Sequence, residues 1–437
     1  MTAECVGCSL NFGHTTERKA QTLESNGIGP DDKIDSLVAN ALNQLSLDER
    51  EALYHELHGV DESIEETSEF VDVSLNELDI ELERIRHSHT KSSAYNLAEE
   101  MSPDYVLDQT LRMKFLRSEK FDVKKSAERM IKFFDCKLYF FGEEKLCKDI
   151  TLQDLDKDDL KALKAGFMQI LPERDRAGRA VFLNVPSKQT FKTPNNKYRA
   201  MFYMAMTMAE DLETQKRGIS IVIYNVEKFE RDKYQSNAVE HTTWIQNCVP
   251  LKTCSLHYCI SDTGFRYVIN IALRFYSEDA RARVKVHFGT HLECSYSLLT
   301  FGCPVNRLPI SLDGTLKRKT HLEFIKMRHQ QESRSELPRI VLPAHDDVLF
   351  GRGKPFRLHV ANIKLHAMIE EEIRLIESLH KCTKVLPIER LTGAIRLGGG
   401  RFLQQDNEGC WVELDEQAVH ERVNRSFRSR LRHVSSQ

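Results

Sequence analysis

Three strand-like segments, all between Gly218 and Gly289, constrain the fold of this 437-residue chain more than any other feature. The first, 218–226, is a β-branched apolar run of the kind that is buried on both faces of a parallel sheet. Segments 253–261 and 284–288 follow, each after a helix-length stretch. The order strand, helix, strand, helix, strand predicts parallel strands joined by helical crossovers, and therefore an α/β fold.

The sequence lacks the glycine-rich loops that hold nucleotide phosphates. After Val226 the chain reads Glu-Lys-Phe-Glu-Arg-Asp, which is too acidic and too rich in side chains to cradle a pyrophosphate. The segment 351–354, Gly-Arg-Gly-Lys, has no glycine at the required position upstream, and Pro355 replaces the Ser or Thr that would bind magnesium. These observations exclude a phosphate-loop nucleotide site.

Composition narrows the class of protein further. With 41% hydrophobic residues and a net charge of -3, the chain is globular, and any contact with nucleic acid needs a local basic patch. The 11 cysteines are scattered and the start lacks a leader pattern, so we expect a reducing, cytoplasmic location. No run reaches the roughly 18 to 20 apolar residues of a membrane span, so membrane association would be peripheral.

Neither cysteine nor histidine spacing predicts a metal site. Cys5 and Cys8 form one CxxC pair without a second pair of ligands nearby. His55 and His58 are one residue too close for two ligands a full helical turn apart. We expect no metal and no cofactor other than a bound ligand.

The chain divides into six predicted parts. Ser46 and Glu49 form a capping box for an amphipathic helix that Gly59 ends. The acidic stretch 61–86 is either a second docking helix or a mobile linker, and the linker is the simpler interpretation. The parts are a disordered tail (1–34), amphipathic helices with an acidic linker (35–91), a helical region (92–170), the α/β domain (171–316), a charged linker (317–342) and a small α-rich domain (343–433).

Two helices carry more apolar residues than a single contact with a sheet requires. The helix predicted over 194–216 has methionines and aromatics on several faces, and the helix over 264–276 has a wide apolar stripe. Both patterns suit either an ordinary core or an adaptable apolar cavity.

Three segments resemble motifs of the CRAL-TRIO family of lipid-binding proteins. Residues 111–123 (LRMKFLRSEKFDV) are similar to the helical turn that precedes the family's lipid domain, 175–182 (DRAGRAVF) to the entry into its first strand, and 308–314 (LPISLDG) to its closing motif. Their order and spacing extend the resemblance over roughly residues 92–316. The chain departs from the family pattern at 225–226 and at 261–263, so the ligand of well-studied members is not carried over.

The resemblance implies helices that enclose a hydrophobic pocket, with residues 264–283 as a gate hinged near 277–280. Arg283 falls close to a basic position that contacts lipid phosphate in phosphoinositide-binding members, and a guanidinium suits a phosphate. A solvated basic turn is the alternative. The predicted pocket residues are Phe202, Met206, Tyr224, Tyr258, Ile260, Phe265, Ile269, Leu273 and Phe275, and the predicted headgroup residues are Arg281, Arg283 and Lys285.

The C-terminal part is similar to an uncharacterised domain known mainly from algal proteins. Its terminal helix concentrates five arginines, Arg422, Arg425, Arg428, Arg430 and Arg432, which suit an anionic partner or a solvated helix face. The residues that match the motif are Asp347, Gly351, Arg352, Gly353, Asn362, Gly399, Gly400, Arg401, Phe402, Leu403, Trp411, Phe427 and Arg428.

The leading hypothesis is binding, and transfer between membranes, of a phospholipid, phosphoinositide or isoprenoid. The alternative is a regulatory scaffold that senses membranes and recruits a protein partner through its C-terminal domain. Binding of nucleic acid by the terminal arginines is a third, weaker hypothesis. We expect no catalytic residues, because no histidine is placed by the sequence beside a nucleophile such as Ser255, Ser261 or Cys254.

Overall fold

The computed structural model describes residues 30–59, 64–88, 93–225, 227–228, 236–333, 342–351, 353–378, 387–406 and 411–434. Most of the predicted tail, including Cys5 and Cys8, lies outside the described residues, and so does Arg352. Helix α2 (Pro30–Gln44) begins inside the predicted tail.

A five-stranded sheet forms the centre of the α/β domain. Its strands lie in the order β1-β2-β3-β4-β5; β1 and β2 are antiparallel and the other pairs are parallel. The predicted parallel strands are therefore confirmed. The strands are β1 (Met168–Ile170), β2 (Ala180–Asn184), β3 (Ile219–Asn225), β4 (Thr253–Ile260) and β5 (Val284–Phe288).

The two faces of this sheet pack against different helices. Along β4, Leu256, Tyr258 and Ile260 belong to the main core, whereas the intervening Cys259 belongs to a smaller core on the opposite face. Helices α8 (Val123–Phe141), α10 (Pro194–Met208), α12 (Ser236–Cys248) and α13 (Phe265–Phe275) contribute to the main core, and α15 (His291–Thr300) to the smaller one.

Local capping determines where α3 (Leu47–His58) begins and ends. The Ser46 hydroxyl accepts a hydrogen bond from the Glu49 amide, and the Glu49 carboxylate accepts one from the Ser46 amide. Gly59 adopts φ 75° and ends the helix with its amide bonded to the Glu56 carbonyl. The predicted capping box and glycine stop are confirmed.

The acidic stretch forms a docked helix, so the alternative interpretation is confirmed and the preferred linker interpretation is wrong. Helix α4 (Ser68–Ser88) packs against α8. Leu78, Leu82 and Ile85 are buried at helical spacing, and the acidic side chains of the helix are exposed except for Glu81. Two apolar residues on the exposed side of the helix, Val73 and Ile80, obscured this period.

The single helix predicted over 194–216 is also wrong, because Asp211 interrupts it. The Asp211 carboxylate accepts a hydrogen bond from the Thr214 amide at 2.7 Å and caps a second helix, α11 (Leu212–Arg217). Its ion pair with buried Arg174, at 2.6 Å, fixes the break. A similar Ser cap at Ser277 begins α14 (Glu278–Ala282), where the sequence predicts a hinge.

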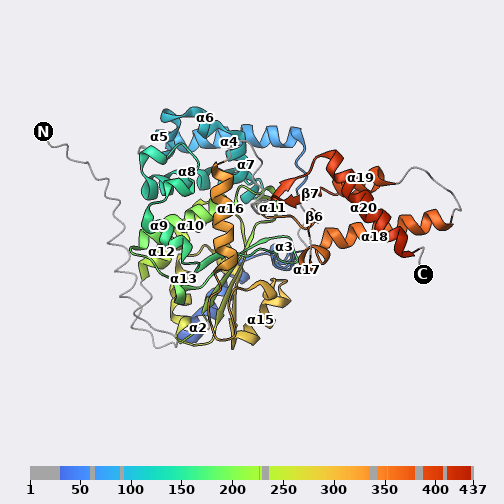
Figure 1. Ribbon diagram of the computed structural model, residues 1–437. Coiled ribbons are helices and arrows are strands. Elements are labelled where there is room, and N and C mark those ends of the chain that lie inside the picture. The colour runs from blue at the N-terminus through green and yellow to red at the C-terminus, as the bar shows by residue number, and fades with distance from the viewer. Residues whose placement is uncertain are drawn as a thin grey trace.

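The remaining helices surround the domain (Figure 1). In the charged linker, α16 (Lys319–Ser333) packs on α9 (Lys157–Lys164), and its buried Arg328 pairs with Glu210 and Glu332. These helices are α5 (Ala94–Met101), α6 (Pro103–Leu107), α7 (Gln109–Ser118), α9 (Lys157–Lys164) and α16 (Lys319–Ser333), with short 3-10 turns at η1 (Glu143–Lys145), η2 (Leu152–Asp154), η3 (Pro186–Lys188) and η5 (Val305–Arg307).

The C-terminal part has a hydrophobic core of its own and lies to one side of the α/β domain (Figure 1). Besides its helices, the part predicted to be α-rich contains a three-stranded sheet in the order β6-β7-β8. The elements are β6 (Val348–Phe350), α17 (Lys354–Arg357), α18 (Val360–Ser378), α19 (Ile388–Leu397), β7 (Phe402–Gln405), β8 (Trp411–Glu413) and α20 (Glu416–Val434).

None of the helices in the described part of the chain combines the length and the apolar character that a membrane span requires.

The docking of α4 is tested by comparing two apolar truncations on this helix. Leu78 is 0% exposed, so Leu78→Ala should lower the free energy of unfolding by about 2–5 kcal/mol. Ile80 is 70% exposed, so Ile80→Ala should change it by less than about 0.5 kcal/mol. Urea denaturation followed by circular dichroism measures both; equal effects would show that α4 is not docked.

Candidate functional site

A cavity of about 440 Å³ lies between α3, the α7–α8 turn and the segments that flank β4 and β5. Its walls come from parts of the chain more than 200 residues apart, and its lining is rich in charge. The charged lining residues are Lys120, Lys125, Arg129, Lys252 and Arg283, and the acidic Glu49, Glu56, Glu119, Asp122 and Asp279.

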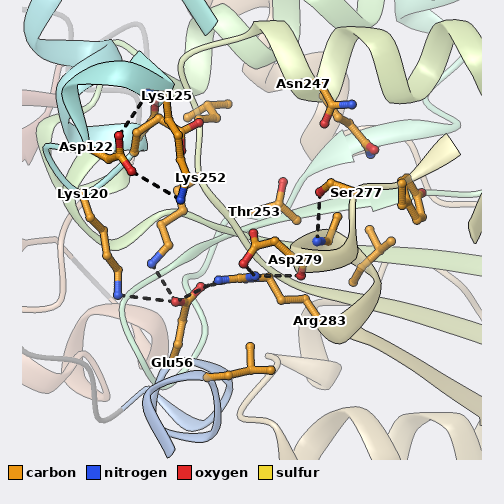
Figure 2. Close-up of a pocket in the computed structure, with 18 of the residues that line it drawn as sticks. Glu56, Lys120, Asp122, Lys125, Asn247, Lys252, Thr253, Ser277, Asp279 and Arg283 are labelled. Carbon is orange, nitrogen blue, oxygen red and sulfur yellow. Dashed lines mark hydrogen bonds and ion pairs between the residues drawn. The ribbon is translucent and has the colours of Figure 1, made fainter. Parts of the chain in front are cut away.

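Glu56 is the centre of this charge cluster. Figure 2 shows that Lys120, Lys252 and Arg283 converge on its carboxylate. The Lys252 ammonium lies 2.9 Å from it, Arg283 Nε donates to it at 3.0 Å, and the Lys120 ammonium lies 3.5 Å away. Only 5% of Glu56 is exposed, so these interactions take place largely out of water.

The cations keep Glu56 ionised. Burial by itself raises the pKa of the carboxyl, but the attraction of Lys252 and Arg283 and their hydrogen bonds outweigh burial and lower the pKa to about 2. Burial likewise opposes the charge on Arg283, while Glu56 and Asp279 favour it and raise the pKa of the guanidinium.

The backbone that carries Glu56 is anchored independently of its side chain. Buried Arg179 donates from Nη1 to the Glu56 carbonyl at 2.8 Å and from Nη2 to the Leu57 carbonyl at 3.3 Å. Asp175 holds the other edge of the guanidinium, with 2.6 Å between Asp175 Oδ2 and Arg179 Nε. The C-terminal carbonyls of α3 are thus capped by a cation.

The structure brings one of the three predicted headgroup residues into this cavity. Arg283 lines the cavity, whereas Arg281 donates to the carbonyls of Leu273 and Arg274 at the end of α13. Lys285 lies in register with His257 on the opposite face of the sheet. Alternation along β5 places Lys285 and the cavity on opposite sides.

Sequence reasoning missed the other cations of the cavity: Lys120, Lys125, Arg129 and Lys252. One signal was available, because Lys120 belongs to the 111–123 motif. There, Lys120 and Phe121 both adopt positive φ, of 51° and 61°, in the turn between α7 and α8. The cavity itself could not be found from sequence, since it depends on distant segments coming together.

Seven of the nine predicted apolar pocket residues share the main core. Tyr224 does not, because it lies in the core of the opposite face, where its hydroxyl contacts His291. Phe275 is half-buried and lies outside the buried core. The seven that pack together are Phe202, Met206, Tyr258, Ile260, Phe265, Ile269 and Leu273.

Hydroxyl and imidazole groups on the opposite face pair among themselves. Ser255 Oγ lies 2.7 Å from Ser220 Oγ, and His257 Nδ1 lies 2.9 Å from His287 Nε2. Burial, followed by the nearby His287, lowers the pKa of His257 to about 3. Among the described residues, no group of three or more His, Cys, Asp or Glu side chains is placed to hold a metal ion.

Most residues of the C-terminal motif stabilise the fold of that domain. Buried Asp347 accepts hydrogen bonds from the Arg401 amide at 2.9 Å and from its guanidinium at 2.7 Å. The Asn362 amide bonds both the Leu349 amide and its carbonyl, at 2.8 and 2.7 Å. Phe402 and Phe427 are buried in the core, and Trp411 packs beside Phe356.

The glycines of this motif occupy positions where a side chain does not fit. A Cβ at Gly351 would lie 2.2 Å from the Phe356 ring, and one at Gly400 would lie 2.1 Å from the Asp346 carbonyl oxygen. Gly353 and Gly399 have φ of 106° and 80°, which favour glycine. The motif is therefore mainly a packing motif.

The five arginines of α20 are used in different ways. The Arg422 guanidinium lies over the Phe350 ring at 5.5 Å, and Arg430 Nε donates to Glu370 at 2.9 Å. Arg425, Arg428 and Arg432 are exposed on the outer face of the helix.

A comparison with protein families matches residues 164–314 to the CRAL/TRIO domain. The chain carries a CRAL/TRIO domain. Such a domain supports lipid binding or lipid transfer as its general role. Residues 347–429 match a domain of unknown function, DUF6824, so the predicted succession of the two domains is confirmed. No curated protein matches the chain.

The ion cluster predicts a specific dependence of stability on pH. Glu56 has a folded pKa of about 2 against an ordinary value of 4.5, so its ionisation stabilises the fold fully above pH 4.5. This contribution is lost as the pH falls from 4.5 towards 2. The difference in unfolding free energy between wild type and Glu56→Gln should therefore narrow below pH 4.5. Urea titrations at several pH values measure this difference in unfolding free energy. A difference that stays constant below pH 4.5 would contradict the predicted role of Glu56.

The packing role of the C-terminal motif is tested with two glycines. Gly400→Ala should destabilise the domain by about 1–3 kcal/mol, because the new methyl group meets backbone. Gly393→Ala, within α19, meets nothing within 4 Å and should stabilise it by about 0.5–1 kcal/mol. Thermal unfolding of the full chain measures both. The two substitutions should change the stability of the domain in opposite directions, and equal changes would contradict the packing role of the motif.

Proposed function

We propose that this protein binds an anionic phospholipid and transfers it between membranes. The CRAL/TRIO domain supports lipid binding in general, and the observation that carries the more specific proposal is a cluster of three cations in the cavity. Three cations from the α7–α8 turn, the start of β4 and the start of β5 converge on one carboxylate there. A phosphate group is a stronger acceptor of the same kind of hydrogen bonds.

Two features support a headgroup at this place with its acyl chains in the domain. Tyr276 lines the cavity and belongs to the main core, where its hydroxyl lies 3.0 Å from that of Tyr258. The cavity therefore adjoins the apolar residues between the sheet and α13. Burial of acyl chains contributes roughly 0.8 kcal/mol per methylene, so the apolar part supplies affinity and the cations supply selectivity.

The proposal assigns the protein a role in binding rather than catalysis, without a metal or an organic cofactor. The ligand is exchanged at the surface of a membrane, which we propose the protein meets peripherally from the cytoplasm. The exposed arginines of α20 would favour anionic membranes.

A lipid-transfer assay tests this function. Full-length protein is incubated with phosphatidylcholine vesicles that contain phosphatidylinositol 4-phosphate, and with acceptor vesicles that lack it. Retained lipid is identified by native mass spectrometry. Lys120 is 43% exposed, so Lys120→Gln should fold normally, yet reduce retention of the anionic lipid by about tenfold through loss of one charged contact. Retention of a neutral isoprenoid should not change.

Lys132→Gln is the matched control. Its side chain is 53% exposed on α8, pairs with Glu128 and does not line the cavity, so retention should equal that of wild type. Membrane binding without transfer of any lipid would favour the scaffold role. Equal retention by Lys120→Gln and wild type would refute the headgroup assignment.

A further inference from the structure

Two N-terminal helices, α2 and α3, lie outside the matched CRAL/TRIO residues, and α3 contributes Glu49 and Glu56 to the lining of the cavity. Helix α2 packs against α13 and α14. Ala41 of α2, Leu53 and Leu57 of α3, and Ala282 of α14 form one apolar cluster. Asp35 Oδ2 lies 3.8 Å from Arg266 Nη2 on α13. The α2–α3 hairpin thus lies against the helices at residues 265–282.

Through Glu56 this hairpin also balances the charge of the cavity. The lining contains five basic side chains and five acidic ones, and Glu56 is the acid that contacts three of the bases. Lys125 and Arg129 have other partners, because they pair with Asp122 and Glu119. Glu56 is therefore the carboxylate that Lys120, Lys252 and Arg283 share, and Arg283 pairs with Asp279 as well.

We propose that Glu56 is an internal ligand of this cation cluster, and that the phosphate of an incoming ligand binds by displacing the Glu56 carboxylate. This inference rests on the proposed function and adds its regulation. The bound state exchanges one anion for another, so the cations stay neutralised throughout. The hairpin therefore sets a threshold: a group binds here only if it interacts with the cluster more strongly than a carboxylate does.

Phosphate meets this requirement for two physical reasons. A phosphate monoester carries up to two negative charges and three acceptor oxygens, whereas a carboxylate carries one charge and two oxygens. It therefore gains more from three converging cations at short range. The cavity of about 440 Å³ in front of Glu56 gives room for the exchange.

The displacement requires only the side chain to move. Arg179 holds the carbonyls of Glu56 and Leu57 whether or not the carboxylate stays among the cations. After displacement, however, α3 loses its ion pairs to β4 and β5. Helix α3 should then exchange its amide hydrogens faster, so binding of phosphate at the cavity is coupled to loosening of the hairpin.

The test uses Glu56→Gln, which keeps the size of the side chain and removes its charge. Pyrophosphate serves as a soluble probe, and vesicles with phosphatidylinositol 4-phosphate serve as the lipid probe. Calorimetry at low salt should show at least tenfold tighter pyrophosphate binding to Glu56→Gln than to wild type. Pyrophosphate should also raise the melting temperature of Glu56→Gln more than that of wild type.

Glu49→Gln is the matched control. Glu49 lies on the same helix and lines the same cavity, but its carboxylate bonds the Ser46 amide at 2.7 Å instead of the cations. It should leave the affinity for pyrophosphate unchanged. Equal or weaker binding of pyrophosphate by Glu56→Gln would overturn the inference, and so would an equal gain in Glu49→Gln.

The two probes separate this inference from the proposed function. Tighter pyrophosphate binding without retention of any lipid supports displacement and removes lipid transfer. Lipid retention that is equal in wild type and Glu56→Gln supports transfer and removes displacement. If Glu56→Gln does not fold, Glu56→Asp withdraws the carboxylate by one methylene, and its affinity for pyrophosphate should exceed that of wild type. No gain in Glu56→Asp would then overturn the inference.

Discussion

A buried carboxylate surrounded by three cations is the interaction on which the arrangement of this domain depends. Charges removed from water are stable only when they are paired, and Glu56, Lys252 and Arg283 have little exposure. Each comes from a different part of the chain, so pairing requires α3, β4 and β5 to meet. The same requirement fixes the N-terminal hairpin against the sheet and against α13 and α14.

The fold was largely predictable because its signals are local. The β-branched run at 218–226 and the Ser46–Glu49 capping box each depend on a few neighbouring residues, and both appear in the structure as expected. Predictions failed where tertiary contacts overrode a local pattern. Asp211, bound by Arg174, caps α11 where one helix was predicted to continue, and α4 packs against α8 with its Leu78 buried.

The site was predictable only in part, for a related reason. Arg283 was identified through its place before β5, but its partner Glu56 is 227 residues away in the chain. Lys285, two residues further, lies within β5 in register with His257, whereas Arg283 ends α14 with helical backbone angles just before the strand. The rule that residues two apart in a strand share one face therefore does not apply to this pair. A short stretch of sequence shows neither which distant residue will pair with a side chain nor which face of the sheet a residue at the end of a strand will occupy.

The position of Glu56 also bears on what counts as one structural unit. The family match begins at residue 164, more than a hundred residues after α3. A fragment cut at that boundary would retain Lys252 and Arg283 without the carboxylate that neutralises them, and would expose the apolar surface of Ala282. The smallest part of this protein that keeps these charges and apolar surfaces covered is therefore longer than the segment that matches the family. It begins at the N-terminal helices, which lie outside that match.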